Sequence, residues 1–241
     1  MKYLDLTFPS PAENLACDEA LLDWCEADGG SEVLRFWESQ KYFVVVGYAN
    51  KVASEVYVAA CEENKIPIQR RCTGGGTVLQ GQGSLNYSLV LKIADHLPLQ
   101  SIPATNQFIL KRNQLALQPL LHGKIELRGQ TDLVVGEKKF SGNSQRRRKN
   151  YLLFHGTFLL NFDLALVENF LRMPSKEPDY RGGRGHSQFL MNLNLSSAIV
   201  KAALKEVWRA DELIANSRLP IAKCQSLAGQ KYSSRDWNWK F

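Results

Sequence analysis

The sequence lacks the features that mark membrane proteins, secreted proteins and zinc proteins. None of its apolar stretches approaches the roughly 18 residues needed to span a bilayer, and its start, Met-Lys-Tyr-Leu-Asp-Leu-Thr, has no apolar run of a signal peptide. The five cysteines are odd in number and form no C-x-x-C pair, so neither a disulfide framework nor a zinc site is indicated. We therefore expect a cytoplasmic protein with reduced thiols, no metal-binding cluster and no membrane partner.

The usual glycine motifs for nucleotide binding are also missing, since neither GxGxxG nor GxxxxGK[ST] occurs. Instead, Arg70 and Arg71 precede Gly74, Gly75 and Gly76, and the stretches on both sides have the apolar pattern of β-strands. Consecutive glycines let a ligand lie directly on backbone N–H groups, and the arginines supply positive charge. The arrangement predicts an anion-binding loop. A glycine hairpin that serves only chain geometry is the alternative.

The net charge of +6 favours anionic partners without naming one. Its densest basic cluster is Arg-Arg-Arg-Lys at 146–149. A solvated loop explains this run as well as a contact for an acidic protein or a nucleotide phosphate does. No nucleic-acid-binding fold and no aromatic platform accompanies the run, so nucleic acid is not an expected partner.

Hydrophobic periodicity indicates an α+β protein. The strands come mostly as hairpins, which favours a mixed, largely antiparallel sheet flanked by helices over a doubly wound sheet. We expect residues 1–241 to form one domain, with a small helical C-terminal subregion from about residue 175. The predicted helices are 14–26, 52–64, 105–121, 164–171, 196–208 and 211–216, and the predicted strands include 43–47, 66–71, 77–80, 85–92, 125–128 and 131–135.

Four motifs occur in the order in which one known family has them. They are PAENLACDEALL at 11–22, the stretch 34–48, the RRCTGGG loop at 70–76, and the segment 132–160 with its KFSG and HGT sequences. Together they resemble the lipoate-protein ligase and octanoyltransferase family, whose catalytic domain is similar to that of biotin-protein ligases. The resemblance runs from about residue 3 to residue 172.

This resemblance implies a ligase that uses ATP, with Mg²⁺, to convert lipoate or octanoate to an acyl-adenylate. The acyl group would then be joined to the lysine of a lipoyl domain, of the kind found in 2-oxoacid dehydrogenase subunits and glycine-cleavage H-proteins. Lys139 is the expected catalytic residue, because its ammonium would stabilise the charge that develops in the tetrahedral transition state. Strand alternation places Lys139 and Ser141 on the ligand side and Phe140 in the core, with Lys138 in solvent.

Further contacts to the acyl-adenylate are expected from Arg70, from the three glycines of the loop, and from Thr77 and Gly142. Arg71, the next residue along the strand, should point away from the ligand.

Two other residues have equal alternatives. Asp132 either binds adenine or a metal–phosphate pair, as the resemblance implies, or caps a turn. His155 either contacts the ligand or is a satisfied histidine of the core.

The sequence departs from the family pattern in ways that keep other functions open. Gln80-Gly-Gln82 stands where ligases usually have an acidic or His-Asp pair, and no C-terminal accessory domain is evident. An octanoyl or lipoyl transferase that takes the acyl group from acyl carrier protein is the first alternative. It needs a thiolate nucleophile, for which Cys72 is the candidate, although packing as a small hydrophobe is the more ordinary role of that residue. A non-catalytic subunit that binds a lipoyl domain or lipoyl-adenylate is the second, and a biotin ligase the third.

Overall fold

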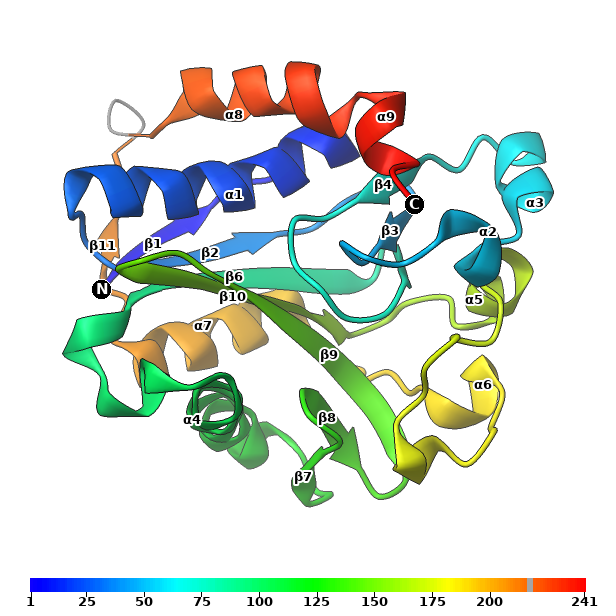
Figure 1. Cartoon of the computed structure of the whole chain (residues 1–241). Helices are drawn as coiled ribbons and strands as arrows, with labels where there is room; N and C mark the ends of the chain where they lie inside the picture. Colours follow the sequence, from blue (N-terminus) through cyan, green and yellow to red (C-terminus); the bar gives the residue numbers. More distant parts are fainter. Residues whose placement is uncertain (216–218) are drawn as a thin grey trace.

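The structure, a computed structural model, describes residues 1–215 and 219–241. Its larger sheet has the strand order β11-β1-β2-β6-β10-β9-β8-β7 (Figure 1). In this order, each strand from β2 through β6, β10, β9 and β8 to β7 is antiparallel to the next, whereas β1 pairs in parallel with both β2 and β11. The predicted mixed, largely antiparallel sheet is confirmed. The strands are β1 (Lys2–Asp5), β2 (Val33–Trp37), β6 (Ser84–Lys92), β7 (Ile125–Arg128), β8 (Asp132–Val135), β9 (Lys138–Arg147), β10 (Tyr151–Leu159) and β11 (Glu212–Leu213).

A second, smaller sheet carries the glycine loop. It has the order β4-β3-β5, with β3 (Phe43–Val46) between β4 (Ile68–Arg70) and β5 (Val78–Gln80). Short helices pack beside it around an apolar cluster that includes Val44, Val46 and Leu79. These helices are α2 (Val52–Glu55), α3 (Val58–Glu63) and α5 (Ala165–Phe170). The glycine loop links β4 to β5 and faces the larger sheet.

Helices cover both faces of the larger sheet (Figure 1). On one face, α1 (Pro11–Asp28) lies beside α8 (Ile221–Leu227), and their apolar side chains pack on β2, β6 and β10. On the other, α4 (Ile102–Leu117) and α7 (Ser197–Trp208) enclose the largest core cluster. Helix α6 (His186–Phe189) comes after β10 and α5 in the chain. After α8, a π-helical turn spans 228–232 and is followed by helix α9 (Arg235–Asn238). Among the described residues, no helix combines the length and apolar character that crossing a membrane requires.

The start of α1 shows how local sequence fixes an element that later carries a site residue. Ser10 and Glu13 form a capping box, in which each side chain bonds the other residue's backbone N–H, and Pro11 occupies the first turn. Gly29 ends the helix in the left-handed conformation, with φ of 61°. The observed helix contains the predicted 14–26 and extends it at both ends.

Two helix predictions need correction. The predicted helix 52–64 is interrupted, because Val56 forms a β-bridge with Leu171 and Tyr57 donates its N–H to the carbonyl of Phe170. The predicted helix 211–216 is wrong over its described part, since residues 212 and 213 extend beside β1 as β11, and Asn216 lies outside the described residues. In both places a tertiary backbone partner overrides local helix preference.

The predicted helix 105–121 is shifted rather than wrong. It begins at Ile102, because the Ser101 side chain accepts the N–H of Ala104 and caps it. It ends at Leu117, where Pro119 follows in a 3₁₀ turn.

Candidate functional site

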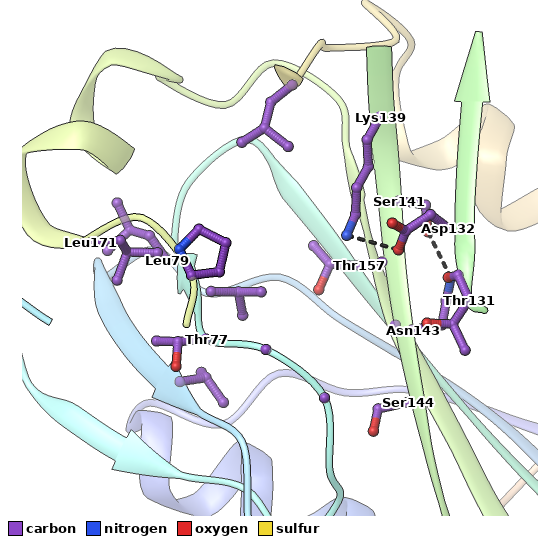
Figure 2. Close-up of a pocket in the computed structure, with 18 of the residues that line it drawn as sticks. Thr77, Leu79, Thr131, Asp132, Lys139, Ser141, Asn143, Ser144, Thr157 and Leu171 are labelled. Carbon is purple, nitrogen blue, oxygen red and sulfur yellow. Dashed lines mark hydrogen bonds and ion pairs between the residues drawn. The ribbon is translucent and has the colours of Figure 1, made fainter. Parts of the chain in front are cut away.

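A cavity of about 1220 Å³ lies between the small sheet with its glycine loop and the cavity-facing side of β6, β8, β9 and β10. The segment 172–181 forms a further wall. Figure 2 shows Lys139, Asp132 and Thr157 on one side of this space, with Thr77, Leu79 and Leu171 across from them. The cavity therefore has charged side chains on one side and the apolar side chains of Leu79 and Leu171 on the other.

Lys139 is held at the cavity by Asp132. Its ammonium lies 2.8 Å from one carboxylate oxygen of Asp132 (Figure 2). The other carboxylate oxygen accepts the hydroxyl of Tyr180 at 2.7 Å. Burial, followed by the Asp132 charge, raises the pKa of Tyr180, so its hydroxyl stays protonated and able to donate. The carboxylate thus orients the lysine and is itself oriented by the segment that closes the cavity.

Gly142 gives the lysine side chain its path. A Cβ built on Gly142 would stand 2.8 Å from the Lys139 Nζ and 2.9 Å from its Cε, so the chain lies directly across this glycine. Among the neighbours, Phe140 is fully buried and Lys138 is exposed, as predicted. A β-bulge interrupts the alternation between Lys139 and Ser141, because Val134 pairs with Lys139 while Leu133 pairs with Ser141. Phe140 and Ser141 both line the cavity. Gly142 also lines the cavity.

The glycine loop is shaped by Arg71. The Arg71 guanidinium donates to the carbonyls of Gly74 and Gly76, at 2.5 and 2.8 Å from Nη2. Within the described chain, the N–H groups of residues 74–77 donate to no protein acceptor, and the loop is exposed. Gly75, which has φ of 82°, lines the cavity with Gly76 and Thr77, whereas Gly74 does not. Free N–H groups of this kind are available to an anionic ligand.

Arg70 does not reach the cavity, and the prediction that it contacts the ligand is wrong. Its guanidinium is buried and donates to carbonyls of the loop 47–50 and to those of Trp237 and Asn238. Asn238 in turn accepts the Arg70 N–H at 2.8 Å. Arg71 is the one of the two that lines the cavity. The two side chains therefore point to opposite sides, as predicted, but Arg71 and not Arg70 is on the cavity side.

Arg70 nevertheless supports the ligand loop from behind. The loop 47–50 touches the glycine loop closely: a Cβ on Gly47 would stand 2.0 Å from the carbonyl oxygen of Gly75. Asn50 donates its side-chain amide to the same oxygen at 3.2 Å. Arg70 therefore connects the C-terminal segment to the backbone against which the glycine loop rests.

His155 belongs to a buried polar chain that the sequence does not reveal. One ring nitrogen lies 3.0 Å from Asp18 of α1 and the other 2.7 Å from the hydroxyl of Thr73. Asp18 also pairs with Arg35 at 2.5 Å. Burial opposes ionisation of Asp18, but Arg35 and His155 outweigh it, so the pKa of this carboxyl is lowered. His155 is satisfied by protein partners, as the core interpretation expects. It also lines the cavity, and its contact with a ligand stays a prediction.

The cysteines lie away from the cavity. Cys72 packs in the apolar cluster under α1 with Cys17, Cys25 and Cys224, and Cys61 packs beside the small sheet. None of the five, all of them in the described chain, lines the cavity. Burial raises the pKa of Cys72 to about 11, which keeps its thiol protonated at neutral pH. The geometry therefore favours the packing role of Cys72 over the nucleophilic one.

The basic run at 146–149 is neither a free loop nor part of the cavity. Arg146 pairs with Glu19 at 3.5 Å, Arg147 donates to the carbonyl of Leu99, and Arg148 pairs with Asp23 at 2.7 Å. These contacts fasten the end of the β9–β10 hairpin to neighbouring helices.

Sequence reasoning missed Asp18, Thr73 and Tyr180. The one signal available was Asp18, an acid among apolar residues on a helical face, since a buried carboxylate needs a partner. Tyr180 and Thr73 are ordinary loop residues in the sequence.

Comparison with solved structures identifies the class of protein that has this fold. The structure of "an archaeal lipoylation system", a bi-partite lipoate protein ligase and its E2 lipoyl domain from Thermoplasma acidophilum, matches with a TM-score of 0.82 at 25% identity over 99% of this chain and 95% of that one. A lipoate-protein ligase A bound with ATP matches with a TM-score of 0.78 at 26% identity, over 99% and 98% of the two chains. The fold is the α+β fold of lipoate-protein ligases.

The sequence comparison narrows the class to a family. The family model described as "Lipoyl protein ligase A/B catalytic domain" matches residues 10–208, so the chain belongs to this family and the resemblance seen in its motifs is confirmed. It is 26% identical to "Octanoyltransferase LipM" of Geobacillus kaustophilus, over 99% of this chain and 98% of the relative. It is also 26% identical to "Probable lipoate-protein ligase A" of Mycoplasma genitalium, over 99% of this chain and 72% of the relative. The protein is an enzyme of lipoyl or octanoyl attachment.

Proposed function

We propose that this enzyme is a lipoate-protein ligase. It activates lipoate, or a similar acid such as octanoate, with ATP and transfers the acyl group to the lysine of a lipoyl domain. The observation that carries this proposal is the pairing of a cavity-lining ammonium, Lys139, with five cysteines that all lie outside the cavity. Acyl-adenylate chemistry needs positive charge at the carboxylate and phosphate, whereas a thioester route needs an accessible thiol.

The reaction has two steps, and charge develops near the same point in both. A carboxylate oxygen attacks the α-phosphorus of ATP and pyrophosphate leaves. The acceptor amine then attacks the acyl carbonyl, and AMP leaves as the amide forms. Lys139 would neutralise the growing negative charge in each step, and removal of such a group typically costs about 3 to 4 kcal/mol in transition-state stabilisation.

The remaining residues of the cavity would position the adenylate. The free N–H groups of Gly75, Gly76 and Thr77 offer bonds to phosphate or carboxylate oxygens, and Ser141 also lines the cavity. Mg²⁺ would enter with ATP as part of that substrate, and Asp132, a carboxylate in the cavity wall, would be available to hold it. The structure of a relative with an E2 lipoyl domain supports a lipoyl domain as the acceptor.

An octanoyltransferase is the second candidate, because a relative of that name aligns with nearly its whole length. Against it stand the burial of Cys72 and the pKa of about 11 that burial gives this thiol. A partner-dependent ligase is the third, because the Thermoplasma acidophilum ligase is described as bi-partite.

The test is a mass-spectrometric assay of an apo lipoyl domain incubated with the protein, ATP, Mg²⁺ and lipoate. A gain of one lipoyl group that disappears in Lys139→Ala and persists in Lys138→Ala supports the ligase, since Lys139 lines the cavity and Lys138 does not. If no gain occurs, activity with preformed lipoyl-AMP alone identifies a partner-dependent ligase. Activity with octanoyl carrier protein alone, through a hydroxylamine-labile acyl-cysteine, identifies a transferase. No activity with any donor leaves a binding subunit.

A further inference from the structure

Two neighbouring residues of the cavity wall each carry a buried N–H donor that has no acceptor among the described residues. The donors are the indole Nε1 of Trp37 on β2 and the amide Nδ2 of Asn86 on β6, and each side chain is only 3% exposed. The two residues are register partners on adjacent antiparallel strands, and both line the cavity. Buried donors in native proteins have partners in nearly all cases, so an unpaired pair in a binding cavity points to a ligand atom that accepts.

Hydrogen bonds around Asn86 occupy its side-chain oxygen. The Gln80 amide donates to the Thr157 hydroxyl at 2.6 Å, and Thr157 donates to the side-chain oxygen of Asn86 at 2.7 Å. Ser84 lies 3.1 Å from the side-chain oxygen of Gln80 and donates to the Gly81 carbonyl at 2.7 Å. In this arrangement the amide end of Asn86 has no partner among the described residues. Gln80, a departure from the family pattern, thus has a specific role.

The backbone position of Asn86 lies two strands away from Gly142, over which the Lys139 side chain runs. The residues Asp132, Gly142, Thr157, Asn86 and Trp37 form one row across β8, β9, β10, β6 and β2. Lys139 lies over Gly142, and Figure 2 shows Thr157 beside it. Asn86 is two strand spacings further, or about 9.6 Å. An extended chain of eight carbons, with C–C bonds of about 1.5 Å each, covers a similar distance.

We infer that Asn86 and Trp37 recognise a hydrogen-bond acceptor at the far end of the acyl chain. This inference rests on the proposed function for the position of the carboxylate, at Lys139. Among the acids considered, lipoate presents two ring sulfurs at that end, and sulfur is a weak acceptor, whereas octanoate presents a methyl group. Octanoate would leave both donors buried and unpaired. The site therefore selects lipoate over octanoate through these donors.

The test compares acids that separate the acceptor from the shape. Lipoate, octanoate and 5-cyclopentylpentanoate, which replaces both ring sulfurs by carbon, are titrated calorimetrically into the protein without nucleotide. Lipoate should bind about three- to tenfold more tightly than the cyclopentyl acid, the range of one ordinary net hydrogen bond. In Asn86→Leu this ratio should fall toward one.

Ser88→Ala is the matched control. Ser88 lies two residues further along β6, is buried and does not line the cavity, so its loss should leave the ratio unchanged. Equal binding of lipoate and the cyclopentyl acid by the wild type overturns the inference, as does an unchanged ratio in Asn86→Leu or the failure of every acid to bind. If Asn86→Leu does not fold, the wild-type comparison and Asn86→Asp, which replaces the donor by an acceptor, decide the matter.

Failure of the proposed function is read separately. Pyrophosphate release from ATP and lipoate is measured on the same preparation. Pyrophosphate release without a binding preference for lipoate over the cyclopentyl acid would support the ligase and contradict the role of Asn86 and Trp37. A preference for lipoate without pyrophosphate release would support that role and contradict an ATP-dependent ligase.

Discussion

Replacing Gly142 by alanine tests the lysine geometry without touching a charged group. The new methyl group would stand 2.8 Å from the Lys139 Nζ and 2.9 Å from its Cε, whereas carbon contacts are optimal at about 3.5 to 4.0 Å. The neighbour in conflict is the flexible end of a side chain, so the backbone of β9 need not move. The ammonium must instead shift by roughly 1 Å, away from the position in which Asp132 holds it at 2.8 Å.

A shift of this size should affect rate far more than stability. Misplacement of a catalytic group by about 1 Å can cost a hundredfold in rate, or about 2.7 kcal/mol in transition-state stabilisation. Alanine in a strand has no conformational penalty relative to glycine, so the free energy of unfolding should change by less than about 1 kcal/mol. We therefore expect kcat for lipoyl-domain modification to fall by about two orders of magnitude while the melting temperature is retained.

The assay is single-turnover modification of the lipoyl domain, followed by mass spectrometry beside a thermal melt. Gly229→Ala serves as the control, since a Cβ at that position meets nothing within 4 Å. A Gly142→Ala enzyme with wild-type kcat would refute the placement of Lys139 across Gly142 or its part in the chemistry.

Three further predictions follow from contacts around the cavity. Asn238→Ala should lower the free energy of unfolding by about 1 to 3 kcal/mol, because it leaves the buried backbone N–H of Arg70 unpaired. It should also raise KM for ATP more than it lowers kcat. An unchanged KM would contradict the role of this contact in positioning the glycine loop. The pKa of Asp18 is lower folded than unfolded, so its contribution to stability is complete above the unfolded pKa and is lost as pH falls through the folded one. Urea unfolding between about pH 5 and pH 2.5 should therefore show a shallower loss of stability on acidification in Asp18→Asn than in the wild type. Cys72→Ala should retain ligase activity, and its loss together with an acyl-cysteine in the wild type would instead indicate a transferase.

What the sequence predicted well was local. Alternation along one strand placed Phe140 in the core and Lys138 in solvent, because the period of a strand is fixed by its backbone. It could not show the β-bulge that separates Lys139 from Ser141. The same rule gave Arg70 and Arg71 opposite directions. It could not say which side is the ligand side, because Trp237 and Asn238 take up Arg70 from 167 and 168 positions further along the chain.

What the sequence could not predict depends on contacts between distant segments. Asp18 meets His155 across 137 positions, and Tyr180 meets Asp132 across 48. No local period or spacing encodes such pairs. The helix predicted at 211–216 failed for the same reason over its described part, since the strand β11 exists only because β1 offers it an unpaired edge.

The contact between Arg70 and the C-terminal segment also has a consequence for how the protein is made. Synthesis proceeds from the N-terminus, and sheets and helices can form while the rest of the chain is still on the ribosome. The Arg70 guanidinium therefore lacks its partner Trp237 until 167 further residues have been synthesised. A chain that ends before Trp237 would leave the loop behind the glycine loop without this support. Shortened products would retain most of the sheet, but their glycine loop would lack its support. Ligand binding would therefore require that translation has proceeded through α9.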